Sequence, residues 1–295
     1  MASAQERAKV LVEALPYIKE FYGKTIVIKY GGHAMLASDL KEAVFTDIVL
    51  MKYVGMNPVI VHGGGPDITA MLQKLGKESK FMSGLRVTDQ ETMDIAQMVL
   101  VGKINKEIVT KINRLGGRAV GLSGQDDNLF EAVKKYHRIS AADGSVELID
   151  IGFVGNITRV NPEIVTAIIQ QGCIPVVSPV AVGPAGEIYN TNADHAAGKL
   201  AAALGSDKLI ILTDVEGIMV DREDPASLIS SLHAHEVAPL IEQGVIDGGM
   251  IPKVESCLDA LAGGVRTAHI IDGRVSHSIL LEVFTDKGIG TMVKM

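Results

Sequence analysis

The stretch Thr25–Gly32 constrains the fold of this chain more than any other part of the sequence. It opens with β-branched residues, which favour a buried strand, and Lys29 follows where that strand should end. Gly31 and Gly32 come next, and glycine lets backbone N–H groups turn toward a ligand with no Cβ in the way. A glycine-rich turn beside a lysine is a phosphate-binding arrangement. On this stretch alone, an ordinary strand-to-helix turn with a surface lysine is an equally good interpretation.

Short apolar runs alternate with helical patterns along nearly the whole chain. We expect strands near residues 25–28, 58–62, 118–123, 173–178, 208–214 and 266–272, and a hairpin or excursion over 124–150. This alternation predicts an α/β fold with a largely parallel sheet. Glycine and polar residues cluster after the strands, at the edge where open α/β sheets bind ligands.

Two further glycine-rich turns precede predicted helices. Gly63–Gly65 follows the strand that ends at His62, and Pro66 suits the first turn of a helix. Lys253 comes shortly after Gly248–Gly249, again at a helix start. Backbone N–H groups at such positions bind anions. His62 could act as a base, but a histidine at a strand end is more often a hydrogen-bonded structural residue.

Three polar residues beside predicted helix starts are candidates for ligand binding. Arg86 stands just before a helix that we expect Thr88 to cap, and arginine is the bidentate partner of choice for a carboxylate. A surface salt bridge is the slightly favoured alternative for Arg86. Asn190 and Asp194 flank the start of an alanine-rich helix, where they could face a ligand or where capping by Asn192 alone could explain the pattern.

Composition excludes several classes of function. The 295 residues are 47% hydrophobic, which is enough for a large core in one or two domains. A net charge of -7 and the absence of tryptophan argue against nucleic-acid binding. Cys173 and Cys257 are too far apart for a metal cluster or a disulfide framework. No apolar run is long enough to span a bilayer, and the N-terminus lacks a secretory signal, so we expect a cytoplasmic protein.

The first segment, residues 3–22, predicts an amphipathic helix. Its apolar stripe is Leu11, Leu15, Ile18 and Tyr22, and Pro16 should kink it near its middle. The helix precedes the first strand, so its stripe must cover its own domain or another subunit. Two nucleotide-binding motifs are absent: Ile18 stands where a P-loop ending at Thr25 needs glycine, and no G-x-G-x-x-G occurs.

Six segments carry a resemblance that spans nearly the whole chain. They are Ile28–Gly32, Val61–Pro66, Gly84–Asp89, Asn190–Asp194, Leu212–Val215 and Gly248–Lys253. In this order they resemble the acetylglutamate kinase family of the amino-acid kinase superfamily. The resemblance implies a largely parallel sheet sandwiched by helices, with two lobes. Residues 1–205 would hold the N-terminal helix and bind acetylglutamate, and residues 206–295 would bind the nucleotide.

The implied reaction transfers the γ-phosphoryl group of ATP to the side-chain carboxylate of N-acetyl-L-glutamate, in arginine biosynthesis. A carboxylate is ionised at neutral pH, so this nucleophile needs no general base. Catalysis then rests on positioning and on stabilising the charge of the phosphoryl oxygens. Magnesium would arrive with ATP, held mainly by the phosphates, and we expect no dedicated metal site.

By the same resemblance, Lys29 and Lys253 would stabilise the transition state and Asp194 would hold the two lysines. The residues expected to bind acetylglutamate are Gly64, Gly65, Arg86 and Asn190. The residues expected to bind the phosphates and the nucleotide are Gly31, Gly32, Asp214, Val215, Glu216, Gly217, Ile218, Met219, Val245, Ile246 and Asp247. Thr191 departs from the family, which usually has an aliphatic residue there.

The kinked N-terminal helix resembles a feature of arginine-inhibited hexamers built as trimers of dimers. Arginine would bind between Tyr17, His269, Glu282 and Gly288, with Glu282 meeting a cationic group. Alternatively, Glu282 is a solvated helix residue. Two other functions stay open: a related kinase for another carboxylate or for carbamate, and a regulatory amino-acid-binding protein without catalysis. The presence of both Lys29 and Lys253 speaks against the latter.

Overall fold

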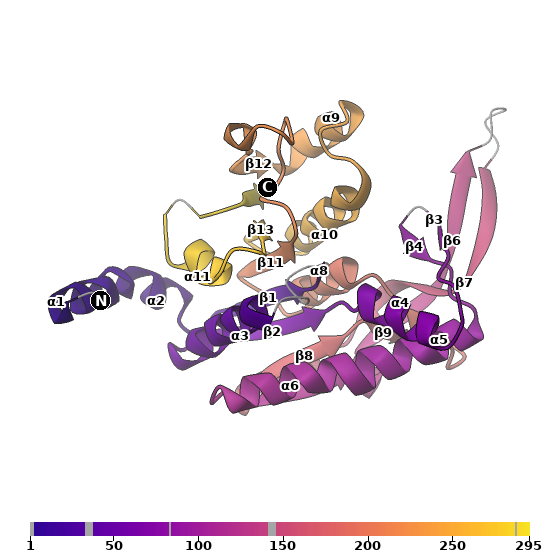
Figure 1. Ribbon diagram of the computed structural model, residues 1–295, viewed down its shortest axis with the longest axis horizontal. Helices are drawn as coiled ribbons and strands as arrows, with labels where there is room; N and C mark the ends of the chain where they lie inside the picture. The colour runs from indigo at the N-terminus through magenta and orange to yellow at the C-terminus, as the bar shows by residue number, and fades with distance from the viewer. Residues whose placement is uncertain (1–2, 33–37, 83, 141–145, 287) are drawn as a thin grey trace.

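The computed structural model describes residues 3–32, 38–82, 84–140, 146–286 and 288–295. Figure 1 shows a body of strands and helices from which two features project at opposite ends. One is the N-terminal pair of helices, α1 (Ala4–Glu13) and α2 (Leu15–Phe21), and the other is the hairpin of β6 (Phe130–Ser140) and β7 (Val146–Val160). The hairpin begins within residues 124–150, where we expected one, but β7 continues to Val160.

An eight-stranded sheet forms the centre of the fold, in the order β12–β14–β13–β11–β1–β2–β8–β5. The strands from β13 to β5 run parallel, which confirms the predicted α/β fold. Their bounds are β1 Thr25–Tyr30, β2 Asn57–His62, β5 Ala119–Ser123, β8 Ile174–Ser178, β11 Lys208–Thr213, β12 Ser231–His233, β13 Thr267–Asp272 and β14 Thr291–Lys294. The short strands are β3 Phe81–Met82, β4 Leu85–Arg86, β9 Val180–Val182 and β10 Ile188–Asn190, of which β9 and β10 close a small barrel with β6 and β7.

Helices cover both faces of the sheet and enclose two hydrophobic cores. The first core is shared with α3 (Ser38–Tyr53), α4 (Gly65–Lys74), α5 (Gln90–Gln97), the π-helix η2 (Met98–Ile104), α6 (Asn105–Arg114) and α11 (Ser278–Val283). The second is shared with α7 (Glu163–Gln170), α8 (Ala193–Ala203), α9 (Val237–Glu242) and α10 (Ile251–Ala262). Short 3-10 turns cover Asp126–Asn128, Pro225–Ser227, Ala234–Glu236 and Gly248–Met250.

The pleat of the central strands sends alternate side chains into the two cores. On β1, Ile26 and Ile28 belong to the first core and Val27 to the second. Lys29 therefore points to the α8 face, like Val27. On β2, His62 shares the opposite, α6 face with Ile60. Two polar side chains thus end neighbouring strands on opposite faces of the sheet.

The segment that was predicted as one kinked helix is a pair of helices separated at Ala14. Pro16 lies in the first turn of α2, where its missing N–H costs nothing. The apolar stripe is only partly covered, because Leu11 is 72% exposed and Tyr22 is 70% exposed. Phe21, which the stripe did not include, is the buried residue of α2.

One predicted cap is wrong. Asp89, not Thr88, caps α5, and its side chain accepts a hydrogen bond from the Thr92 N–H. The Thr88 hydroxyl instead donates to the Arg86 carbonyl at 2.8 Å. Because Thr88 pairs with Gly152 of β7 in an isolated bridge, it is extended and lies outside the helix.

Candidate active site

Lys29 lies on β1 at the point where the order of the strands reverses. The chain passes from β1 to β2 on one side and later returns to β11 on the other, so that Lys29 is level with Val61 and Ile211. In open α/β sheets such a switch point opens a crevice at the carboxyl ends of the strands. The Lys29 side chain is buried there.

Asp194 lies in the first turn of α8, directly against Lys29. Asn192 caps this helix by accepting hydrogen bonds from the N–H groups of Asp194 and His195, which is the capping that was weighed as the alternative to ligand binding. The Asp194 carboxylate contacts two lysines: Oδ1 lies 2.9 Å from Lys29 Nζ, and Oδ2 lies 3.4 Å from Lys253 Nζ. The structure thus brings together all three residues that were expected to be catalytic.

Lys253 comes from the first turn of α10, and its ammonium also donates to the Gly249 carbonyl at 3.2 Å. Burial raises the pKa of Asp194, but the charges of Lys29 and Lys253 outweigh this effect and hold that pKa below its usual value. The carboxylate is therefore ionised at neutral pH. Two cations share one anion, which leaves a net positive charge that suits an anionic ligand.

The first two glycine turns lie side by side at this charge cluster. The Gly63 N–H donates to the Tyr30 carbonyl at 2.8 Å, which ties the turn after β2 to the end of β1. A Cβ on Gly31 would lie 2.8 Å from Lys29 Nζ, so any side chain at this position would displace the ammonium from its present place. Gly32 has a φ of +66°, a left-handed conformation that glycine adopts without strain.

A pocket of about 180 Å³ opens next to the glycine turns. All four residues that were expected to bind acetylglutamate line it: Gly64, Gly65, Arg86 and Asn190. Its apolar wall includes Ile68, Phe81 and Leu100. The pocket is of a size for a small ligand, with a cationic group at one side.

Arg86 is buried beside this pocket with neutral partners. Its guanidinium donates to the Gly65 carbonyl at 2.9 Å, to Thr69 Oγ1 at 2.8 Å and to Ser79, and it lies over the Phe81 ring. Burial lowers its pKa, yet arginine stays charged at neutral pH. Among the described residues no carboxylate forms an ion pair with Arg86, so the favoured alternative of a surface salt bridge is wrong.

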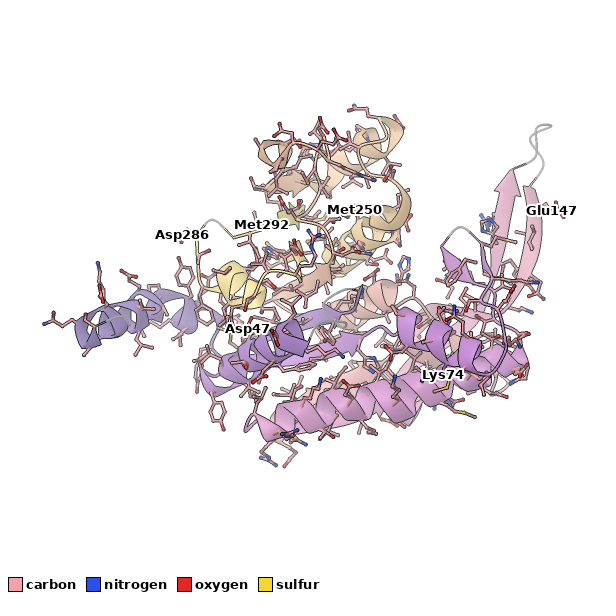
Figure 2. All side chains as sticks on the ribbon, viewed as in Figure 1. Asp47, Lys74, Glu147, Met250, Asp286 and Met292 are labelled. Atoms are coloured by element: carbon pink, nitrogen blue, oxygen red, sulfur yellow. The ribbon has the colours of Figure 1, made fainter. Side chains whose placement is uncertain are left out.

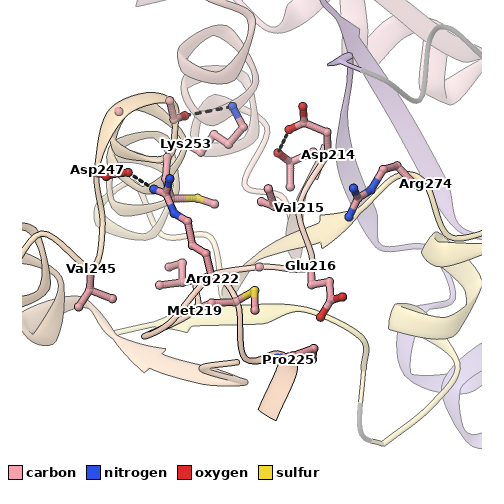
Figure 3. Close-up of a pocket in the computed structure, with 16 residues that line it drawn as sticks. Asp214, Val215, Glu216, Met219, Arg222, Pro225, Val245, Asp247, Lys253 and Arg274 are labelled. Carbon is pink, nitrogen blue, oxygen red and sulfur yellow. Dashed lines mark hydrogen bonds and ion pairs between the residues drawn. The ribbon is translucent and has the colours of Figure 1, made fainter. Parts of the chain in front are cut away.

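Lys253 also lines a larger pocket of about 640 Å³ (Figure 3). Most of the expected nucleotide residues line it as well: Asp214, Val215, Glu216, Gly217, Ile218, Met219, Val245 and Asp247. Ile246 does not, because its side chain is buried in the second hydrophobic core. The family resemblance implied these residues as a set, and it could not tell which side chains of residues 245–247 point into the pocket.

Two arginines in this pocket had been missed. Figure 3 shows Arg222 pointing to Asp247, with which it forms an ion pair, and Arg274 on the opposite wall near Asp214. Arg274 pairs with Asp272 at 2.8 Å, at the end of β13. Arg274 comes right after a strand that ends at the ligand-binding edge, so a signal for it was present. Arg222 lies in a charged loop, and nothing in that part of the sequence indicated that its side chain lines a pocket.

The four residues that were expected to bind arginine lie apart from both pockets, near α11. His269 Nδ1 lies 2.6 Å from Glu282 Oε1, and a Cβ on Gly288 would lie 2.7 Å from Glu282 Oε2. Tyr17 donates to Asp286, labelled in Figure 2, at 2.6 Å, and its ring meets Phe284 edge-on. The alternative of a solvated Glu282 is wrong, because its side chain is 8% exposed.

The described residues contain no cluster of three His, Cys, Asp or Glu side chains that could hold a metal ion. In the same residues, none of the helices has the length and apolar character that crossing a bilayer requires.

Comparison with known proteins identifies the relatives of this chain. Residues 24–272 match the amino acid kinase family. An acetylglutamate kinase from Pelotomaculum thermopropionicum is 74% identical over 294 residues, which is 100% of both chains. An acetylglutamate kinase from Moorella thermoacetica is 63% identical and covers 99% of this chain and 98% of its own length.

A solved structure is similar along almost the whole chain. It is N-acetylglutamate synthase from Neisseria gonorrhoeae complexed with coenzyme A and N-acetyl-glutamate, with 27% identity and a TM-score of 0.81. The match covers 98% of this chain but 63% of the synthase, so this chain spans less than two thirds of that protein. The same synthase was also solved with coenzyme A and L-arginine, with 25% identity, a TM-score of 0.77 and coverage of 97% and 65%.

Proposed function

The chain belongs to the amino acid kinase family, and we propose that it acts as the acetylglutamate kinases to which it is similar. It transfers the γ-phosphoryl group of ATP to the side-chain carboxylate of N-acetyl-L-glutamate and yields N-acetyl-L-glutamyl 5-phosphate and ADP. The step belongs to arginine biosynthesis, and we place it in the cytoplasm. The observation that carries the proposal is the cluster of Lys29, Asp194 and Lys253 between a small pocket and a large one.

The chemistry follows from this charge cluster. A carboxylate oxygen of the substrate attacks the γ-phosphorus, while the bond from that phosphorus to the oxygen of the leaving ADP breaks. Both reactants are anions, so the main barriers are their mutual repulsion and the charge on the phosphoryl oxygens. The ammonium groups of Lys29 and Lys253 offset this charge, and Asp194 holds them at fixed positions. The N–H groups of Gly31, Gly32 and Gly64 supply further donors.

Each pocket takes one substrate in this proposal. Arg86 and Asn190 bind N-acetyl-L-glutamate in the small pocket, because a buried guanidinium with neutral partners has charge left for a carboxylate. The large pocket binds ATP between residues 214–219 and Asp247. Magnesium enters as part of the ATP substrate and is held mainly by its phosphates.

We also propose the two lobes, with residues 1–205 for acetylglutamate and 206–295 for the nucleotide. The pockets divide in this way, since the linings of the small and the large pocket fall on either side of residue 205. The sheet nevertheless continues across the boundary, because β11 pairs with β1.

Feedback inhibition by arginine is part of the proposal. Glu282, His269, Gly288 and Tyr17 surround the region between α2 and α11, where Glu282 is a buried anion. A guanidinium would replace or supplement the contact from His269 to Glu282. The synthase of similar fold was solved with L-arginine, which is consistent with such a site.

Helix α1 supports a further proposal, assembly into a hexamer as a trimer of dimers. Val10, Leu11 and Val12 are 63%, 72% and 69% exposed on this projecting helix (Figure 1). A second copy of the same helix would cover them, since exposed apolar surface of this kind stabilises association when it is buried.

The test is to trap the acyl phosphate with hydroxylamine. The purified chain is incubated with magnesium, ATP and N-acetyl-L-glutamate, with L-glutamate as the matched control substrate and arginine in a parallel series. We expect hydroxamate from N-acetyl-L-glutamate alone and less of it with arginine. If arginine does not change the amount of product, the kinase activity stands and the proposed inhibition by arginine is wrong. Absence of product would overturn the proposed substrate, and carbamate and other carboxylates would be tested next.

A further inference from the structure

His62 is a fully buried histidine on the opposite face of the sheet from Lys29. It is the last residue of β2, and it immediately precedes the glycine turn that lines the small pocket. Its ring has two polar contacts: Nδ1 lies 2.9 Å from the Gly63 carbonyl oxygen, and Nε2 lies 3.3 Å from Asn105 Nδ2. No step of the proposed reaction uses this side chain.

The contacts define which nitrogen carries the proton. A carbonyl oxygen only accepts, so Nδ1 must donate to Gly63, and in the neutral ring Nε2 is then free to accept from Asn105. Burial lowers the pKa of His62 to about 4, so the ring is neutral at physiological pH. His62 is therefore held as one tautomer.

Asn105 is itself fixed on several sides. Its Nδ2 carries two hydrogens and has three acceptors within reach, the Val176 carbonyl oxygen at 2.9 Å, the Leu122 carbonyl oxygen at 3.2 Å and His62 Nε2 at 3.3 Å, so one N–H is shared between two of them. Its Oδ1 accepts from Lys106 at 3.3 Å. The amide cannot flip, because the exchange would turn its oxygen toward two carbonyl oxygens. Asn105 thus connects the imidazole to β8 and β5, the two strands that follow β2 in the sheet.

The contact to Gly63 determines how the next peptide group is turned. The peptide unit is planar and trans, so the Gly63 carbonyl and the Gly64 N–H point in opposite directions. Because His62 holds the Gly63 carbonyl toward its own ring, the Gly64 N–H points away from His62. Leu100 and Ile104 press on the same glycine, since a Cβ on Gly64 would lie 2.6 Å and 2.5 Å from their terminal carbons.

We propose that His62 is a positioning residue for phosphoryl transfer, anchored by Asn105, and that it aims the Gly64 N–H at the transferring group. The inference rests on the proposed function, because it assigns the Gly64 donor to that reaction. It adds the residues that orient this donor from the far face of the sheet, and neither His62 nor Asn105 lines either pocket.

Two substitutions at one position separate aiming from packing. His62→Leu removes both ring nitrogens, and we expect kcat to fall about 10- to 100-fold, as for a misplaced group or a lost donor. The KM for ATP should change little, since neither His62 nor the glycine turn after it lines the large pocket. His62→Asn keeps an N–H donor at the δ position of the side chain, and we expect it to restore most of kcat. Equal kcat in wild type and His62→Leu would overturn the proposal, as would equal losses in both variants.

A third variant disturbs the anchor from outside. A Cβ on Gly121 of β5 would overlap Asn105 Oδ1, so Gly121→Ala displaces the amide without touching the pocket. We expect Gly121→Ala to lower kcat by a larger factor than it raises the KM for N-acetyl-L-glutamate. A loss explained entirely by a smaller folded fraction, measured by thermal unfolding, would contradict the aiming role.

The tautomer gives a readout that needs neither substrate nor variant activity. In a chain with 15N-labelled histidine, the His62 resonances are assigned by their absence in His62→Asn. We expect a proton on Nδ1 and none on Nε2 between pH 6 and 8. A proton on Nε2 would refute the proposal even if the enzyme is active. Conversely, wild type that makes no hydroxamate would overturn the proposed function and not the tautomer.

Discussion

Asp194 Oδ1 lies 2.9 Å from Lys29 Nζ, and this contact joins the central strand of the sheet to the first turn of a helix 165 positions later in the chain. Both side chains are buried, so the pair keeps its geometry without help from solvent. Lys253 completes the cluster from a third element. The consequences for activity and stability can be measured separately.

Asp194→Asn should lower kcat by roughly 100-fold, because a neutral amide no longer holds two ammonium groups in place. The folded pKa of Asp194 is lowered, so its stabilising contribution is present above the unfolded pKa and is lost as pH falls through the folded one. The variant should therefore be less stable at neutral pH and lose less stability on acidification. Urea unfolding at pH 7 and at pH 3 measures this.

The control for Asp194 is Asp259→Asn. Asp259 pairs with Lys199 at 2.9 Å, and this pair joins the same two helices, α8 and α10, on the exposed surface. Exposed ion pairs contribute less than about 1 kcal/mol, so kcat and stability should stay near wild type. Similar losses in both variants would mean that helix docking, not the charge cluster, carries the effect.

Gly31→Ala should abolish most activity while the chain stays folded. The new Cβ would lie 2.8 Å from Lys29 Nζ and 3.1 Å from its Cε, so the flexible lysine must move away from its place beside Asp194. We expect kcat to fall about 100-fold, since a shift of 1 Å in a positioned group has that effect. Gly102→Ala is the control, because a Cβ there meets nothing within 4 Å. An active Gly31→Ala enzyme would contradict the assigned position of the lysine.

Arg86→Lys should raise the KM for N-acetyl-L-glutamate and leave the KM for ATP unchanged. The guanidinium donates to Gly65, Thr69 and Ser79 at once, which a single ammonium cannot reproduce. Loss of a charged hydrogen bond worth about 1.5–3 kcal/mol corresponds to roughly 10- to 100-fold in KM. Arg159→Lys, at an exposed pair with Glu131, serves as control. A change in the KM for ATP alone would mean that Arg86 acts on the nucleotide, which would contradict its place in the acetylglutamate pocket.

Asp47→Asn should change how stability depends on pH. Asp47 on α3 is fully buried and lies 2.6 Å from His277 Nδ1 beside α11 (Figure 2 labels Asp47). Burial raises the pKa of Asp47 from 3.8 to about 6. Such a carboxyl contributes stability that is full below pH 3.8 and is lost as pH rises through about 6. Asp47→Asn has no carboxyl group at this position, so its free energy of unfolding does not fall in this way as the pH rises.

The measurement for Asp47 is the free energy of unfolding at several pH values from 4 to 8. The difference between Asp47→Asn and wild type should shift in favour of the variant up to about pH 6 and then level off. Asp94→Asn, on the exposed side of α5, should show no such trend. Parallel curves for Asp47→Asn and wild type would show that Asp47 ionises normally.

Deleting residues 1–13 should produce a smaller oligomer with full kcat and weaker inhibition by arginine. The deletion removes α1 and its exposed apolar residues, but it keeps Phe21 in the core and Tyr17 beside Phe284. Light scattering and arginine titration measure the two effects. An unchanged mass would show that α1 does not hold the oligomer together. Unchanged inhibition by arginine in a smaller oligomer would show that the inhibition does not depend on the assembly.

The strands and their glycine turns could be predicted because their causes are local. β-branched runs ending in Lys29 or His62, followed by glycine, place the ligand edge without any knowledge of neighbours. The meeting of Asp194 with the two lysines was expected from family resemblance alone, since nothing in the spacing of these residues shows that α8 and α10 lie side by side.

Other features depend on contacts that periodicity does not contain. Glu282 has the pattern of a surface helix residue, yet His269 of β13 buries it. Ile246 and Asp247 are adjacent, and only the fold decides that one enters the core and the other the pocket. Thr88 looks like a cap because the sequence does not show that β7 holds it extended.

The π-helix η2 has a consequence for insertions and deletions. Each helical residue turns its successor by about 100°, so the wider turn of Met98–Ile104 sets the direction in which Asn105 and the whole of α6 face. A π turn holds one residue more than an α turn, so removing one residue from Met98–Ile104 would let the segment close as an α-helix with Asn105 still facing His62. Removing one residue from the regular turns of α5 would instead rotate Asn105 and the whole of α6 by about 100°. A single deletion should therefore be tolerated inside η2 and not in the helix that precedes it.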